Sequence, residues 1–241
     1  GTSIWFRPDS ELFEVHNFDP QLIRQTLEAR AWLHQVKIVF KDRTNHETYR
    51  FDHSDSTLDG FLAQIVGSEP RAHGWEENIF LYSRVEDPRL DIALLWSQEG
   101  GEQVRSFVNG INTPQGGTHD LGLKAGIVRA VRNYLEVHNL QPKGLKLSAE
   151  DIRDGLRAIV AIYLSEPQFK GQTKERLNNP EVNAQVANAL APALERYLNE
   201  NPSVASGLVE RIVQGAKERA AAQQASTLVS RKAVTRKLNL P

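Results

Sequence analysis

The pattern of apolar and polar residues along the chain alternates between strand-like and helix-like spacing, which predicts a domain of mixed α and β structure. Short runs of alternating or continuous apolar residues, bounded by turn residues, predict strands at 2–6, 37–40, 48–51, 78–85, 90–97, 102–109 and 156–165. Apolar residues three or four positions apart predict helices at 20–34, 57–66, 120–138, 180–200 and 202–238.

Residues that favour helix ends mark several of these boundaries. Asp19 is expected to cap the first helix, with Pro20 at its first helical position. Ser148 and Asp151 have the spacing of a capping box, which predicts one more, short helix. Thr118 or Asp120 is expected to cap the long helix predicted at 120–138.

The arrangement of the strands is predicted from their order and burial. The runs at 78–85, 90–97 and 102–109 follow one another closely, which favours an antiparallel meander. The run at 156–165 is almost continuously apolar, as expected for a strand that is buried on both faces of a sheet.

The last predicted helix is longer than a small domain is wide, since 36 residues span about 54 Å. Val204, Leu208 and Ile212 make one side of its first half apolar, while its second half is nearly all Ala, Gln and basic residues. A helix of this kind typically leaves its own domain and bridges to another. We therefore expect an α+β domain followed by a long protruding C-terminal helix.

The composition excludes several kinds of site. The 241 residues include no Cys, so there is no disulfide, thiolate metal site or cysteine nucleophile, which is compatible with a reducing cytoplasm. No run approaches the roughly 18 apolar residues that span a bilayer, so no membrane partner is expected. The chain has no Met and begins at Gly1, so we expect a longer protein from which an upstream part has been removed.

The charge is unevenly distributed along the chain. Residues 1–100 carry 10 Lys and Arg against 17 Asp and Glu, whereas residues 101–241 carry 19 against 13. The basic part either faces a polyanion or is an ordinary solvated surface, and the counts leave both interpretations open.

The stretch "QGGTHD" (115–120) precedes a predicted helix, whose N-terminus offers free N–H groups to anions. It lacks the glycine, lysine and hydroxyl spacing of a P-loop, so a tight strand-to-helix turn is the favoured interpretation. His119 is interpreted as a packed or capping imidazole. No His, Asp and Glu cluster has metal-ligand spacing and no nucleophile-elbow serine is present, so we assign no catalytic or metal-binding residue within the chain.

Three separated segments occur in an informative order: "SFVNGINTPQGGTHDLGLKAGIVRAV", "LSAEDIRDGLRAIVAIYLSEPQFKGQTKERLNNPEV" and "SRKAVTRKLNLP". Together they resemble the transducer domain of the DNA gyrase B subunit, and the topoisomerase IV counterpart looks almost the same. The resemblance covers nearly the whole chain, is strongest over 104–182 and is weaker over 34–75. The segment 29–38 is one residue shorter than the usual family pattern.

This resemblance implies a domain division. Residues 1–8 would be the last strand of a preceding GHKL ATPase domain, 9–200 the transducer domain, and 201–241 a long helix leading to the topoisomerase core, which begins at the "LP" of 240–241. The family fold implies a split βαβ unit with a left-handed crossover, made from the strand at 102–109, the helix at 120–138 and the strand at 156–165.

The resemblance also implies where the chemistry lies. In this family the catalytic glutamate, the Mg²⁺-binding asparagine and the adenine pocket belong to the GHKL domain, so ATP and Mg²⁺ would be bound mainly there. By motif match, Gln172 and Lys174 of "GQTK" reach the γ-phosphate of ATP. In an extended loop, residues two apart point to the same side, so both side chains could approach one phosphate. This fragment alone is expected to be inactive.

The resemblance places Lys124 at a basic position that faces the cavity through which a DNA segment passes. Arg129 and Arg132 lie within about 140° of Lys124 around the same predicted helix. The three side chains could track DNA phosphates without reading sequence, although each arginine could equally be a solvent-facing charge.

The function implied is a coupling module of an ATP-hydrolysing type IIA DNA topoisomerase, an isomerase of the cytoplasm that works as a homodimer with DNA and the gyrase A subunit. The topoisomerase IV B subunit is the alternative within that class. A non-enzymatic module of the same fold that binds nucleic acid or protein is the alternative outside it. A self-sufficient NTPase is disfavoured, because the sequence shows no Walker-type loop.

Overall fold

The computed structural model describes residues 2–12, 14 and 17–237, with side chains as far as residue 222. The chain divides into two compact units, Gly1–Thr57 and Leu58–Pro241. All residues to which the sequence analysis assigns a contact with phosphate or DNA belong to the second unit.

The first unit contains a helix that packs on a two-stranded antiparallel hairpin. Its elements are α1 (Pro20–His34), β1 (Lys37–Asp42) and β2 (Glu47–Asp52). Asp19 Oδ1 accepts hydrogen bonds from two backbone N–H groups of the first helical turn, at 2.9 and 3.3 Å. The predicted cap, helix and hairpin are therefore confirmed.

The strand predicted at 2–6 is wrong, because the described residues from 2 to 9 have no regular structure. A strand needs a neighbouring edge to which its backbone can hydrogen-bond, and residues 2–6 pair with none of the described strands. Ile4, Trp5 and Phe6 are 81, 87 and 68% exposed. The apolar pattern is real, but it forms no strand pairing among the described residues.

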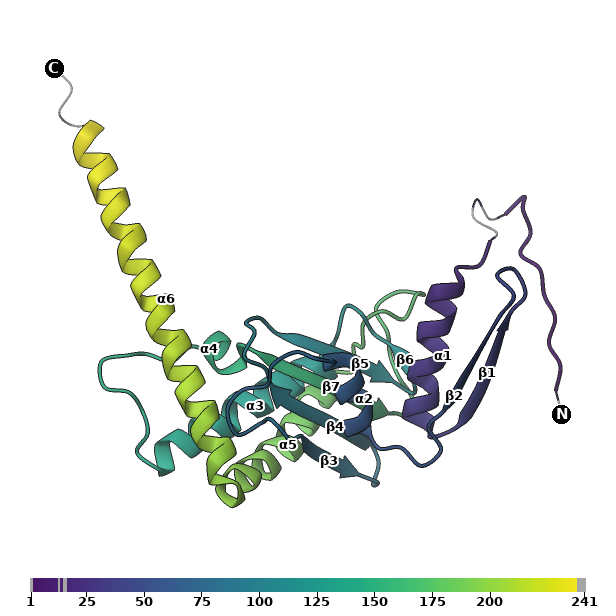
Figure 1. Cartoon of the computed structure of the whole chain (residues 1–241), viewed down its shortest axis with the longest axis horizontal. Coiled ribbons are helices and arrows are strands. Elements are labelled where there is room, and N and C mark those ends of the chain that lie inside the picture. The colour runs from purple at the N-terminus through teal and green to yellow at the C-terminus, as the bar shows by residue number, and fades with distance from the viewer. Residues whose placement is uncertain (1, 13, 15–16, 238–241) are drawn as a thin grey trace. The chain divides into compact units, whose positions relative to one another are not determined.

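The centre of the second unit is a five-stranded sheet in the order β3–β4–β7–β5–β6 (Figure 1). Its strands are β3 (Phe80–Arg84), β4 (Arg89–Trp96), β5 (Gln103–Val108), β6 (Ile111–Asn112) and β7 (Leu156–Tyr163).

The predicted three-stranded meander is only partly correct. Strands β3 and β4 form the expected antiparallel pair, but β7 lies between β4 and β5. Val160 of β7 is opposite Ile92 of β4 on one side and opposite Ser106 of β5 on the other. The most continuously apolar strand thus takes a central position, where both of its faces are covered.

A βαβ unit lies within this sheet, formed by β5, α3 (Thr118–Val137) and β7, and its two strands are parallel. The predicted α+β class is confirmed. The strands β5 and β7 hydrogen-bond directly to each other, so no strand separates them and the predicted split arrangement does not apply. The left-handed crossover stays a prediction.

Helices cover both faces of the sheet (Figure 1). Helices α3 and α5 (Pro180–Glu200) pack against each other on one face, and α2 (Leu58–Val66) packs on β4 and β7. Every residue from 156 to 162 is buried, as the continuous apolar run predicts.

The last helix, α6 (Pro202–Lys237), has 36 residues, ends one residue before the predicted end and extends beyond the sheet and helices of its unit (Figure 1). Val204, Leu208 and Ile212 are buried, which confirms the predicted apolar side of its first half. The "LP" at 240–241 lies outside the described residues. None of the described helices is long and apolar enough to cross a membrane.

Two arginine side chains fix the first half of α6 to neighbouring loops. Arg211 Nη2 donates to Asp154 Oδ2 at 2.9 Å, and its Nη1 donates to the carbonyl oxygen of Gln98 at 2.9 Å. Eight residues later, Arg219 donates to both carboxylate oxygens of Asp151, each at 2.7 Å.

Asp151 joins α6 to α4 (Ala149–Arg153). Its carboxylate also accepts a hydrogen bond from the backbone N–H of Ser148, which confirms the predicted capping box and short helix. The hydrogen bonds from Arg219 are the main cause of the lowered pKa of Asp151, so the carboxylate is charged at neutral pH. The Asp151 carboxylate therefore takes part in the cap of α4 and also binds Arg219 of α6.

Close packing at the start of α6 generates a prediction. A Cβ atom on Gly207 would lie 1.7 Å from the carbonyl oxygen of His73, which belongs to the backbone and cannot move aside alone. We expect Gly207→Ala to lower the free energy of unfolding by about 3 kcal/mol, measured by urea denaturation.

Gly215, two turns further along α6, is the matched control, since its nearest contact would be 4.0 Å away. Gly215→Ala should raise the stability by up to about 1 kcal/mol through helix propensity. Equal effects of the two substitutions would contradict the predicted close contact.

Candidate functional site

The segment 168–178, which carries the "GQTK" motif, folds back on itself as a narrow loop. The backbone N–H of Lys170 donates to the carbonyl of Arg176 at 2.9 Å, and the N–H of Asn178 donates to the carbonyl of Gln168 at 2.8 Å. Phe169 and Leu177 form an antiparallel bridge across its base. These hydrogen bonds close the base of the loop, and its tip is exposed to solvent.

This loop is joined by backbone hydrogen bonds to the glycine loop that precedes α3. Leu177 N–H donates to the carbonyl of Gly116 at 3.1 Å, and Leu177 accepts from Thr118 N–H at 3.2 Å. Gln115 adds a side-chain hydrogen bond to Glu175. The two motifs, 60 residues apart in sequence, thus form one structural element.

Gly117 has to be a glycine for this junction to form. Its φ of 134° is unfavourable for a residue with a side chain, and a Cβ atom would lie 2.4 Å from the carbonyl oxygen of Leu177. The interpretation of the glycines as a tight turn is confirmed, and the structure adds that the turn accommodates a second loop.

Gln172 and Lys174 are both exposed at the tip of the loop. The expected extended backbone is wrong here, because Gln172 belongs to a turn and Lys174 has a left-handed φ of 58°. A non-glycine residue in that region is held at a cost of about 1 kcal/mol, and such strain is common at functional positions. The Lys174 ammonium lies 5.9 Å from the ring centre of Phe169.

The start of α3 differs from the predicted cap. The capping residue is Gly117, without a side-chain hydrogen bond, and the Thr118 hydroxyl is buried without a partner. The cap is unnecessary because the carbonyl of Leu177 already accepts the N–H of Thr118. The expected capping role of Thr118 or Asp120 is therefore wrong.

His119 is packed inside the protein, as interpreted from the sequence. Its Nε2 lies 3.1 Å from Thr113 Oγ1, which in turn donates to the carbonyl of Ser106 at 2.9 Å. Burial lowers the pKa of His119 to about 4, so the imidazole is neutral at pH 7. It supports the junction of the loops and does not face solvent as a base.

The three predicted DNA-facing residues line one hollow of about 680 Å³ along α3. Arg129 is exposed and donates to Asn188 and to the carbonyl of Ala187 on α5. Arg132 is exposed and forms no ion pair among the described residues. The structure thus brings Lys124, Arg129 and Arg132 together, while contact with DNA stays a prediction.

The Lys124 ammonium is paired with two carboxylates, which the sequence analysis does not predict. Its Nζ lies 2.8 Å from Glu102 Oε1 and 3.0 Å from Asp120 Oδ2. Burial lowers the pKa of the ammonium, but the hydrogen bonds to these carboxylates raise it by more, and the net shift is upward. The i, i+4 spacing signals the pair with Asp120, whereas no local signal reveals Glu102.

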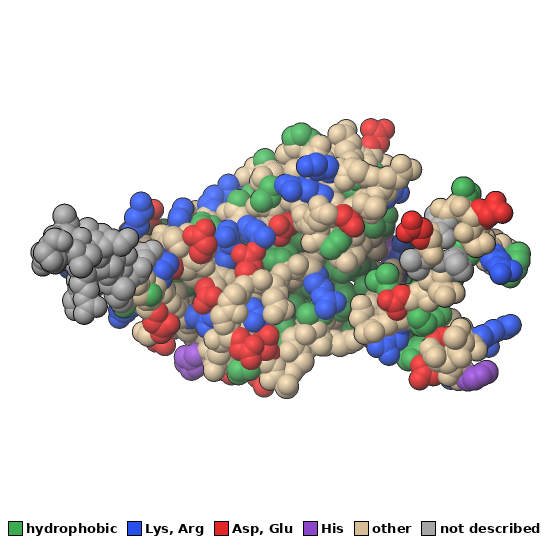
Figure 2. All heavy atoms as spheres, turned by 90° about the horizontal axis from the view of Figure 1, so that it is seen from above, with side chains coloured by type: hydrophobic (Ala, Val, Ile, Leu, Met, Phe, Trp, Pro, Cys, Tyr) green, Lys and Arg blue, Asp and Glu red, His purple; other side chains and the backbone are tan. Residues whose placement is uncertain are grey.

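Arg153 of α4 is a fourth cation of the same hollow and was missed in the sequence. Its Nε lies 2.8 Å from Glu102 Oε2. On the face shown in Figure 2, basic and acidic side chains of the described residues are interspersed.

The candidate site suits an anion better than a metal ion. Exposed Gln172 and Lys174 supply an amide and an ammonium to a phosphate group. Across the described part of the chain, no three His, Asp or Glu side chains are grouped so that they could hold a metal ion. The residues of this site therefore fit a phosphate but not Mg²⁺.

The junction of the two loops generates a prediction. Gly117→Ala should separate them and make the amides of Leu177 and Thr118 exchange with deuterium about tenfold faster or more, because the new Cβ displaces the Leu177 backbone. Hydrogen exchange read by mass spectrometry measures this effect.

Gly171→Ala, at the tip of the same loop, is the matched control, since a Cβ there would meet nothing within 4 Å. Its φ of 85° adds strain but no collision, so exchange at Leu177 should be unchanged. Unchanged protection in the Gly117 variant would show that the junction does not depend on the glycine.

Comparison with known proteins places these features in a family. The chain is 35% identical over 236 residues to the DNA gyrase B subunit of Campylobacter jejuni, covering 96% of this chain and 30% of the relative. It is 38% identical over 244 residues to the DNA topoisomerase 4 B subunit of Escherichia coli, covering all of this chain and 38% of the relative. The chain thus spans about a third of the length of these relatives.

Solved structures give the same result for the fold. The 43K ATPase domain of Thermus thermophilus gyrase B superposes with a TM-score of 0.75 at 29% identity, covering 92% of this chain and 59% of that one. The topoisomerase IV ATP-binding domain of Francisella tularensis gives 0.71 at 30% identity, covering 88% and 57%. The family model described as DNA gyrase B matches residues 57–228, which is more than half of the chain. This chain belongs to the DNA gyrase B family.

Proposed function

We propose that this chain is the transducer part of the B subunit of a type IIA DNA topoisomerase. In that subunit it couples ATP binding and hydrolysis, in a preceding GHKL domain, to motion of the DNA gate and strand passage. The observation that carries the proposal is the exposed tip of the loop 168–178, fixed by backbone hydrogen bonds to the start of α3.

The loop suits recognition of a terminal phosphate. Lysine provides a compact point charge for phosphate oxygens, and an amide nitrogen of glutamine donates beside it. Lys174 is exposed, and its ammonium lies 5.9 Å from the ring centre of Phe169 in the same loop. When hydrolysis and release remove the γ-phosphate, the loop loses its partner, which is a known way to switch a protein between two arrangements.

The domain division follows from the same role. In the complete subunit, residues 1–8 would pair with a sheet of the GHKL domain as its last strand, 9–200 would be the transducer domain and 201–241 the helix that leads to the topoisomerase core. Exposed Ile4, Trp5 and Phe6 support this assignment, because a sheet of the preceding domain would cover them. ATP and Mg²⁺ are bound mainly by that domain, and the complete protein works as a cytoplasmic homodimer together with the gyrase A subunit.

The hollow along α3 is proposed to face the transported DNA segment. Lys124, Arg129 and Arg132 line it and offer no arrangement that reads base edges, so the contact is with phosphates and independent of sequence. Gyrase and topoisomerase IV relatives resemble the chain to a similar degree, so either identity fits. The same hollow favours one alternative, a nucleic-acid-binding module that does not use ATP.

Lys174 is the test of the nucleotide role. In the complete subunit, Lys174→Ala should lower kcat for ATP hydrolysis about a hundredfold, because a cation that stabilises charge on the transferred phosphate is lost. The free energy of unfolding should change by less than about 0.5 kcal/mol, since the side chain is exposed.

Lys170→Ala removes the same charge from the same exposed loop and serves as the control. Its kcat should equal that of the wild type. Equal rates for both variants would mean that the loop is ordinary surface and would favour the module that does not use ATP.

Arg132 is the test of the DNA role. Arg132→Ala should weaken binding to duplex DNA by a similar factor for unrelated sequences and reduce the slope of log affinity against log salt by about 1. Arg50→Ala, which removes an exposed arginine of the first unit, should leave the slope unchanged. Fluorescence anisotropy at several salt concentrations measures both. If the two variants lose the same slope, bulk charge rather than the hollow explains binding.

A further inference from the structure

The carboxylate of Glu102 lies between two cations of the basic hollow. Its Oε1 is 2.8 Å from Lys124 Nζ, and its Oε2 is 2.8 Å from Arg153 Nε. The side chains of Glu102, Lys124 and Arg153 are 23, 27 and 20% exposed, so this bridge is partly shielded from solvent.

Three separate elements bring these groups together. Glu102 directly precedes β5, Lys124 lies in the second turn of α3, and Arg153 is the last residue of α4. The backbone near Glu102 is itself held, because Gly101 N–H donates to Asp154 Oδ1 at 2.7 Å and the Gly101 carbonyl accepts from Arg157 at 3.0 Å. The fold thus fixes the acidic group beside Lys124 and Arg153, two residues that line the hollow.

The bridge divides the cations of the hollow into two kinds. Arg129 donates to neutral groups and Arg132 has no ion pair among the described residues, so neither is paired with a carboxylate there. Lys124 and Arg153 are each paired with Glu102, and Lys124 is also paired with Asp120. Half of the basic side chains are therefore already occupied by an anionic group.

A carboxylate and a phosphodiester present the same kind of partner to these cations, because each offers two anionic oxygens to N–H donors. A phosphate that approaches Lys124 and Arg153 must displace Glu102 or accept its repulsion. Either effect weakens the binding of DNA phosphate to Lys124 and Arg153 and leaves its binding to Arg132 unchanged.

We propose that Glu102 is a built-in competitor for DNA phosphate, which holds Lys124 and Arg153 while the hollow is empty and is displaced when a duplex enters. The inference rests on the proposed contact between this hollow and DNA. It adds that the contact is weakened by the fold itself, which suits a segment that must pass through and not remain bound.

The test compares Glu102→Gln with the wild-type chain. Glutamine keeps the size of the side chain and one acceptor oxygen, but it replaces the other oxygen with an NH2 donor and removes the charge. The chain should then bind a labelled duplex of about 20 base pairs about three- to tenfold more tightly, with a salt slope steeper by about one to two as freed cations reach phosphates. Fluorescence anisotropy between about 50 and 200 mM KCl measures both.

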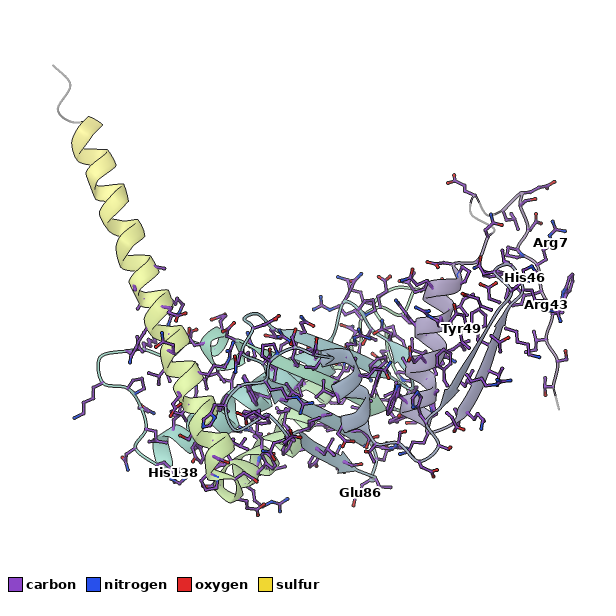
Figure 3. The ribbon with its side chains drawn as sticks, viewed as in Figure 1. Arg7, Arg43, His46, Tyr49, Glu86 and His138 are labelled. Atoms are coloured by element: carbon purple, nitrogen blue, oxygen red, sulfur yellow. The ribbon has the colours of Figure 1, made fainter. Side chains whose placement is uncertain are left out.

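Glu86→Gln is the matched control, since it makes the same change of net charge. Glu86 is exposed at the turn between β3 and β4, labelled in Figure 3, and that turn is at the opposite end of β4 from Glu102. This control should leave the salt slope unchanged. Adding Lys124→Gln to the Glu102 variant should remove much of the gain, because the freed ammonium is then absent.

The outcomes separate this inference from the proposed function. If the wild type binds and Arg132→Ala weakens binding, but Glu102→Gln behaves like Glu86→Gln, the competitor role is wrong and the DNA role stands. If neither the wild type nor the Glu102 variant binds duplex, the competitor role and the proposed contact with DNA are both wrong.

A measurement on the wild-type chain tests the displacement of Glu102 even if a variant fails to fold. The NMR signal of the Arg153 Nε–H group should shift when duplex is added and should not shift with an equal concentration of added salt. An unchanged signal at saturating duplex would overturn the displacement of Glu102.

Discussion

The backbone pairing of Leu177 with the glycine loop at Gly116 and Gly117 is the contact on which the candidate site depends. It supplies the acceptor for the N–H of Thr118, the first residue of α3, and it holds the base of the loop that carries Gln172 and Lys174. Because the contact is made by backbone atoms and admits no Cβ at Gly117, the loop and the helix move as one piece. The phosphate loop of the proposed function is therefore built into the start of a core helix.

From α3 the contacts continue to α6 through charged groups. Lys124 and Arg153 share Glu102, which connects α3 to α4, and Asp151 of α4 is held by Arg219 of α6. Arg211 adds a second attachment of α6 to the loop before Glu102. Such ion pairs are individually weak at a surface, but these are partly buried and share partners. They therefore fix the first half of α6 against α4 and the loop before Glu102.

Most individual elements could be predicted from the sequence, and the failures share one cause. Asp19, Ser148 and the apolar periodicity of α5 and α6 act within a few residues, so the helices they mark were predicted correctly. The expected strand at 2–6 and the expected cap of α3 were wrong because their hydrogen-bond partners are decided by distant segments. Within the candidate site, a motif drew attention to the loop with Gln172 and Lys174, whose role stays a prediction, whereas Glu102 and Arg153 have no local signal.

The sequence by itself determined the fold class, the caps of α1 and α4 and the positions of the two loops, because these depend on spacing and side-chain chemistry along a short stretch of chain. Only the tertiary structure decided which strand takes the centre of the sheet and which charges meet. Arg157 shows the reason, since it lies within the apolar run of β7 yet is buried against Glu69, 88 residues earlier in the chain. Pairing between residues so far apart is set by how the elements pack, and no local pattern records it.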